Sequence, residues 1–150
     1  MKRTTLLIIL LIIAALATAC APAAPATEEA VNSLTVSDAD NQQTISLEAI
    51  QELPQMTANF QDIDYVGVTL PTLLEDAGIS LDDVTAIKAV ASDGYSVNYE
   101  PALYTREDVI LAYAQADGPL AEDDGALRMV VPGERGQMNV RMVVEIEVVR

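Results

Sequence analysis

The chain has 150 residues, of which 51% are hydrophobic, and a formal net charge of −15 from 23 acidic and eight basic side chains. Such an acidic excess excludes nucleic acid as a partner, because a phosphate backbone is bound through clustered Lys and Arg. The chain has no histidine and a single cysteine, which excludes Ser-His-Asp and Cys-His catalysis and zinc sites built on those ligands.

Residues 1–19 have the order of an export signal, with a basic start, an apolar run and a tail of small residues. The run is too short to span a bilayer, which takes about 20 apolar residues. Cys20 follows the small residues and resembles the lipidated cysteine of bacterial lipoproteins, although Ala17 stands where that pattern has Leu. We expect a lipid anchor on Cys20 at the extracytoplasmic face of a bacterial membrane. The alternative is ordinary signal cleavage, which would leave a secreted protein with a free terminal thiol.

Residues 20–33 continue with Ala, Pro and small polar residues that show no apolar periodicity. This composition predicts an extended tether. Residues 34–150 then have the length of one domain with its own core. Without the signal, six basic residues remain against 23 acidic ones. We interpret these acidic residues as a solubilising surface. An anionic bilayer would also repel the domain that carries them.

The stretch "DADNQQTISLE" begins the domain and places Asp38, Asp40 and Gln42 at alternate positions, as in a calcium-binding EF-hand loop. The loop needs Gly at its sixth position and Glu at its twelfth, where this chain has Gln43 and Ala49. A hairpin turn between strands over 34–37 and 43–46 is the better interpretation.

Two short helices are predicted next, separated by a strand. The first covers "LEAIQEL", with Ser46 as its N-cap and Pro54 as its stop. The strand is "QMTANFQDI", in which apolar and polar residues alternate. The second helix lies within "YVGVTLPTLLEDAGI", with Pro71 in its first turn and Gly78 at its C-terminal cap.

The second half of the chain is dominated by strands. Val- and Ile-rich or alternating runs occur over 84–92, 95–100, 109–115, 127–132 and 138–149, with Gly, Pro and Asp clusters between them. Two short helices among six or seven strands predict an α+β domain with a mixed sheet.

Four pieces of the sequence, in this order, resemble the molybdopterin-binding domain of the sulfite oxidase type in its small single-domain form. They are "YVGVTLPTLLEDAGI", "SDGYSVNY", "DVILAYAQADGPL" and "GALRMVVPGERGQMNVRMVVEIEVV". The resemblance covers nearly all of residues 34–150. It implies a mixed α+β fold whose loops can bind a pterin cofactor, and therefore molybdopterin as the cofactor.

The sequence departs from this family at the position of the metal-binding residue. The resemblance implies a molybdenum-ligating cysteine after the strand "QMTANF", where this chain has Gln61, Asp62, Ile63 and Asp64. The family's cofactor-binding histidines are missing too, and a carboxylate is an unusual substitute for the sulfur that holds molybdenum. The closing motif, usually Gly-x-x-Ser-x-Lys before Trp, is Gly136 to Met142 here, with Asn139 and Arg141 at the Ser and Lys positions.

The stretch "SDGYS" at 92–96 has two interpretations. Asp93 and Gly94 suit a turn between two strands, because Gly tolerates positive φ and Asp bonds its own backbone. Tyr95 could instead contact a ligand, but no histidine is present to act as its acid or base. A turn is therefore the preferred interpretation.

Arginines near the end of the chain are the better candidates for ligand binding. Three of the six basic residues outside the signal lie within fourteen positions, which would form a local anion-attracting patch. The alternative is that they pair with surface carboxylates such as Glu134 and Glu145. The candidate cofactor-binding residues are Tyr95, Arg128, Arg135, Gly136, Asn139 and Arg141.

Two functions remain open at this point. The first is a lipid-anchored, non-catalytic module that binds an anionic small molecule or a protein partner. The second is an oxidoreductase that uses molybdopterin without cysteine ligation. The missing cysteine favours the first, and the intact "GALRMVVPGERG" segment supports the second.

Overall fold

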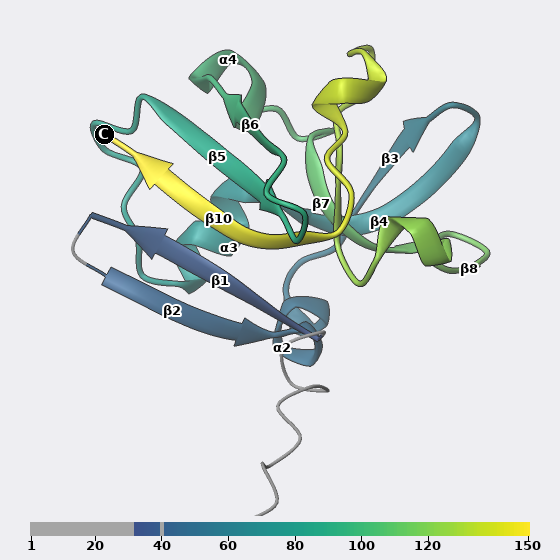
Figure 1. Ribbon diagram of the computed structural model, residues 1–150, viewed down its shortest axis with the longest axis horizontal. Coiled ribbons are helices and arrows are strands. Elements are labelled where there is room, and N and C mark those ends of the chain that lie inside the picture. The colour runs from purple at the N-terminus through teal and green to yellow at the C-terminus, as the bar shows by residue number, and fades with distance from the viewer. Residues whose placement is uncertain (1–31, 40) are drawn as a thin grey trace, which may run out of the picture.

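The computed structural model describes residues 32–39 and 41–150 and contains two five-stranded sheets (Figure 1). The expected signal, Cys20, most of the expected tether and Asp40 lie outside the described residues. No helix in the described ranges is both long and apolar enough to cross a membrane.

The first sheet joins the two ends of the domain. Its spatial order is β2 (Asn41–Ser46), β1 (Ser33–Asp38), β10 (Val143–Val149), β5 (Ala86–Ala91) and β6 (Ser96–Tyr99). The pair β1–β10 is parallel and the other pairs are antiparallel. Because β1 and β10 are parallel, the start of the domain lies at the same end of the sheet as the start of its last strand.

The second sheet contains the middle of the chain. Its order is β3 (Met56–Phe60), β4 (Ile63–Thr69), β7 (Ile110–Gln115) and β8 (Gly118–Pro119), with β9 (Arg128–Val130) also paired with β7. Figure 1 shows the β3–β4 hairpin projecting away from the first sheet.

In the described part of the chain, three short α-helices and two 3-10 turns connect the strands. They are α2 (Leu47–Glu52), α3 (Leu70–Asp76), α4 (Pro101–Tyr104), η1 (Glu122–Asp124) and η2 (Gly136–Met138). The Oγ of Ser46 accepts the Ala49 N–H at the start of α2, and Oγ1 of Thr69 caps α3 in the same way. These caps satisfy amides that no helical carbonyl can reach.

The main core lies between the first sheet, the helices and one face of the second sheet. Its strands contribute alternate residues, as the two-residue period of a strand requires, and α3 contributes Leu70, Leu73 and Leu74, all with 0% exposure. A smaller cluster on the other face of the second sheet contains Ala58, Tyr65, Ile110, Ala112 and Val130. The α+β class is therefore confirmed.

Candidate functional site

A concave site of about 490 Å³ lies where the turn after β5 meets the segment before β10. The residues that line it are Ala91, Asp93, Tyr95, Gly136, Gln137, Asn139, Arg141 and Met142. Tyr95, Gly136, Asn139 and Arg141 are four of the six candidate residues, so the structure brings together positions up to 46 residues apart. Figure 1 shows the segment with η2, in yellow, rising above the first sheet before the chain enters β10.

The turn between β5 and β6 forms one wall. Oδ1 of Asp93 accepts the Tyr95 N–H at 2.9 Å, and Gly94 has a φ of 87°. This is the turn chemistry expected from the sequence. The phenol of Tyr95 then donates to the Gln137 carbonyl at 2.9 Å, while 47% of the residue stays exposed. Tyr95 therefore belongs to the turn through its backbone and lines the site with its side chain.

Buried polar groups hold the opposite wall in place. The hydroxyl of Tyr99 donates to the Met138 carbonyl at 2.6 Å, and burial raises the pKa of this phenol, so that it remains a donor. Oδ1 of Asn139 accepts the Val131 N–H at 2.7 Å, and its Nδ2 donates to the Arg135 carbonyl at 3.2 Å. Asn139 is 4% exposed, so it organises the loop rather than offering its amide to a ligand.

Met142 is held in an unusual backbone conformation. Its φ is 49°, which a side chain rarely adopts without support. The support comes from its N–H, which donates to the Asp124 carbonyl at 2.8 Å, and from its own carbonyl, which accepts the Ser92 N–H at 2.9 Å. The Met142 side chain lines the site and is partly exposed. Strained residues of this kind cluster at binding sites.

A buried ion pair connects the site to the smaller core cluster. Nη1 of Arg128 donates to Oδ1 of Asp124 at 2.9 Å and to the hydroxyl of Tyr65 at 3.0 Å. The guanidinium lies 4.6 Å from the centre of the Tyr65 ring and 5.8 Å from that of Phe60, within the range of cation–π attraction. Arg128 is 3% exposed and does not line the site, and its Nε has no hydrogen-bond partner in the described chain.

The same carboxylate also holds the cation of the site. Nε of Arg141 lies 3.2 Å from Oδ1 of Asp124, and 56% of the Arg141 side chain is exposed. The partner of both arginines is thus Asp124, not Glu134 or Glu145, which the sequence suggested as alternatives. Glu145 instead accepts a hydrogen bond from Ser37. Asp124 was not a candidate, although its i, i+4 spacing from Arg128 is a signal that could have identified it.

Arg135, the sixth candidate, is exposed and immediately precedes η2, but it does not line the site. Gly136 does line it, and a Cβ added there would meet no protein atom within 4 Å. The space over Gly136 is therefore open to a ligand.

The position of the expected metal ligand is a tight turn. Gln61 and Asp62 join β3 to β4 and both have positive φ, 55° and 63°, as in the preferred two-residue hairpin turn. Asp64 Oδ1 accepts from Asn59 across this hairpin at 2.7 Å. No group of three His, Cys, Asp or Glu residues suited to a metal occurs in the described ranges. The turn therefore lacks the sulfur ligand that the family resemblance implies for a molybdenum centre, and its residues fit that centre poorly.

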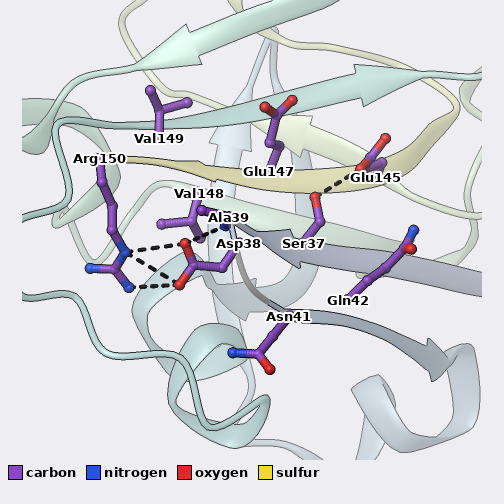
Figure 2. A pocket seen from close by; sticks show the side chains of 10 residues that line it. All are labelled: Ser37, Asp38, Ala39, Asn41, Gln42, Glu145, Glu147, Val148, Val149 and Arg150. Carbon is purple, nitrogen blue, oxygen red and sulfur yellow. Dashed lines mark hydrogen bonds and ion pairs between the residues drawn. The ribbon is translucent and has the colours of Figure 1, made fainter.

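A second concave region, of about 660 Å³, lies at the other end of the first sheet (Figure 2). Figure 2 shows Arg150 reaching Asp38, with Nη2 2.8 Å from Oδ2. This hydrogen bond is the main reason that the pKa of Asp38 lies below its usual range. Asp38 therefore closes the β1–β2 hairpin and binds the C-terminal residue. The hairpin predicted over this stretch is confirmed.

Comparisons with known proteins agree with this architecture. Residues 34–150 match the family model described as "Oxidoreductase molybdopterin binding domain". Mitochondrial sulfite oxidase from Drosophila melanogaster is 34% identical over 91 residues, which cover 55% of this chain and 16% of that enzyme. These matches support molybdopterin as the cofactor of the family and confirm the resemblance to the sulfite oxidase type.

A solved structure supports the fold independently. The sulfane dehydrogenase SoxCD from Paracoccus pantotrophus superposes with a TM-score of 0.67 at 20% sequence identity. The match covers 81% of this chain and 39% of that chain. The chain thus spans well under half the length of either relative.

Proposed function

The chain belongs to the oxidoreductase molybdopterin binding domain family, and from this premise we propose that it is a lipid-anchored, extracytoplasmic binding module without catalytic activity of its own. It keeps the fold of the family and binds an anionic small molecule or a protein partner at the site between the β5–β6 turn and η2. The activities of the longer relatives belong to those proteins.

One observation carries this proposal. The segment that would supply the metal-ligating cysteine is reduced to the turn at Gln61 and Asp62, and the described ranges contain neither cysteine nor histidine. Oxygen donors on an exposed hairpin are unusual substitutes for a thiolate that holds and tunes a molybdenum centre. Without that centre the fold has no redox group, and binding is the function that remains.

The envelope location rests on the N-terminal sequence. An export signal followed at once by the only cysteine of the chain is typical of a lipoprotein. Two acyl chains would hold the protein on a membrane without a spanning helix, since each buried methylene contributes about 0.8 kcal/mol.

A molybdopterin-dependent oxidoreductase is the second candidate. It is supported by the family match and by the intact segment "GALRMVVPGERG", which supplies both β9 and the loop before η2. In that case Asp62 and Asp64 would be the first residues to mutate.

The metal and pterin content of the purified protein separates the two candidates. The chain is expressed with its own signal in a host that makes and exports molybdenum cofactor, beside a cysteine-containing family member as the positive control. Molybdenum is measured by mass spectrometry and pterin by the fluorescence of its oxidised form. We expect the control to be loaded and this chain to contain less than about a tenth of a metal ion per molecule, since it lacks the thiolate. Near-stoichiometric molybdenum would overturn the proposal.

A further inference from the structure

We propose that the site binds an organic monocarboxylate with an apolar or aromatic body, and that it discriminates against phosphate. This inference rests on the proposed function, because it names the ligand class of the same site. Three features carry it: the way in which Arg141 is held, the carboxylates around it, and the apolar side chains that line the cavity with it.

Arg141 contacts Asp124 through one edge of its guanidinium. Its closest approach to Asp124 is through Nε, at 3.2 Å. Among the described residues, none of the hydrogen bonds found uses Nη1 or Nη2 of Arg141. The two terminal nitrogens of a guanidinium present parallel N–H groups whose spacing matches the two oxygens of a carboxylate. A guanidinium that contacts Asp124 through Nε leaves that end-on pair free for a ligand.

The charges around Arg141 limit how negative the ligand can be. Asp124 already compensates Arg128 and also contacts Arg141, while Asp93 lines the same cavity. A phosphate carries between one and two negative charges at neutral pH, so it would place more negative charge than a carboxylate beside these two side chains, and like charges at short range repel. A monocarboxylate matches the charge of Arg141, the one basic side chain that lines the cavity, with less repulsion. The short η2 offers no helix end to offset the difference.

The remaining lining favours an apolar body on the ligand. Tyr95 is 47% exposed and Met142 38% exposed, and both line the cavity with Arg141. Large apolar side chains left in water become favourable contacts when a ligand covers them, and an aromatic ring can stack on Tyr95 while the flexible thioether adapts. A cavity of about 490 Å³ has the size of ordinary small-molecule sites.

Binding is tested by NMR of the backbone amides on the exported protein carrying Cys20→Ser. This protein has no acyl chains, and ordinary signal cleavage removes its apolar run, so detergent is not needed. The probes are phenylacetate, its neutral analogue 2-phenylethanol, and inorganic phosphate. We expect phenylacetate to shift the amides of Tyr95, Gly136 and Met142 saturably, with at least about ten-fold weaker binding of the other two probes. The inference would be overturned if either phosphate or 2-phenylethanol bound as tightly as phenylacetate.

Variants test the role of the guanidinium. Arg141→Lys keeps the charge but lacks the paired N–H groups of the guanidinium, so phenylacetate should bind roughly ten-fold more weakly. Gly136→Ala should also weaken phenylacetate binding, because it places a methyl group in the open space. Arg135→Gln is the matched control, because that arginine is exposed and does not line the cavity. Equal losses in Arg135→Gln and Arg141→Lys would contradict the inference. If the protein contains no molybdenum and phenylacetate does not bind, only the inferred ligand class is wrong. If the protein contains molybdenum, the proposed function is wrong.

Discussion

Asp124 is the residue on which both the core and the site depend. The residue is 3% exposed, and its carboxylate lies between the buried guanidinium of Arg128 and the exposed one of Arg141. A buried charge is tolerated only when it is paired and hydrogen-bonded, so each of these groups fixes the position of the next. The rings of Tyr65 and Phe60 complete the surroundings of Arg128.

Asp124→Asn should therefore destabilise the fold strongly. The substitution keeps the shape of the side chain but leaves Arg128 buried without a counter-charge, for which we expect a loss of about 3 kcal/mol in the free energy of unfolding. The measurement is equilibrium denaturation in urea. Asp108→Asn is the matched control, since its pair with Arg106 is half-exposed and should contribute less than about 1 kcal/mol.

A loss in Asp124→Asn no greater than in Asp108→Asn would contradict this role for the buried pair. The double variant Asp124→Asn with Arg128→Met removes both charges at once. It should recover part of the stability, because replacing a buried ion pair with apolar volume is often neutral.

The roles of single residues could be predicted from the sequence where the residue type itself favours one local conformation. Gly94 and Asp93 were predicted as a turn from their own conformational preferences, and the structure confirms the turn. The contribution of Met142 could not be predicted, because its left-handed conformation depends on backbone bonds to Asp124 and Ser92, which are distant in sequence. Arg128 was placed among the ligand-binding candidates because its burial cannot be read from charge alone.

At the scale of elements, periodic segments were predicted well. The helix over 47–52 begins at its predicted N-cap, Ser46, and the helix over 70–76 has Pro71 in its first turn as predicted. The strand-rich second half is confirmed. The predicted strand over 138–149 begins only at Val143, because residues 136–138 form a 3-10 turn and the loop after it serves the site. The four-residue α4 was not predicted, since one turn shows no helical period.

Gly67 shows why the β4–β7 pairing requires glycine at one position. A Cβ at Gly67 would lie 2.2 Å from the Leu111 carbonyl oxygen and 2.6 Å from the Cα of Ala112, beside a bulge in the ladder. Gly67→Ala should therefore force the two strands apart and destabilise the protein by about 3 kcal/mol. Thermal unfolding followed by circular dichroism measures the effect.

Gly118→Ala in β8 is the control for this substitution. A Cβ there meets nothing within 4 Å and the φ of Gly118 is not positive, so its melting temperature should stay within a few degrees of the parent. Similar melting temperatures for the two variants would show that the close approach at Gly67 is not a constraint on the fold.

At the scale of the whole molecule, the chain enters the domain at the end where the site lies. β1 starts at Ser33, runs parallel to β10, and both start at the end of the sheet where β5 finishes at Ala91. The ion pair between Asp38 and Arg150 lies at the opposite end. Residues 20–32 would span at most about 45 Å if fully extended. An anchor at Cys20 would thus keep the site within reach of molecules at the membrane surface.

Cys20→Ser tests that arrangement. Two acyl chains give stable membrane association, whereas a domain with a large acidic excess has no affinity of its own for an anionic bilayer. We expect the variant to move from the membrane fraction to the soluble extracytoplasmic fraction, measured by fractionation and immunoblotting. Thr27→Ser is the matched control, because it alters the same segment and leaves Cys20 intact. If the parent protein is already soluble and the mass of its N-terminal peptide shows an unmodified thiol, ordinary signal cleavage is correct and the anchor is not.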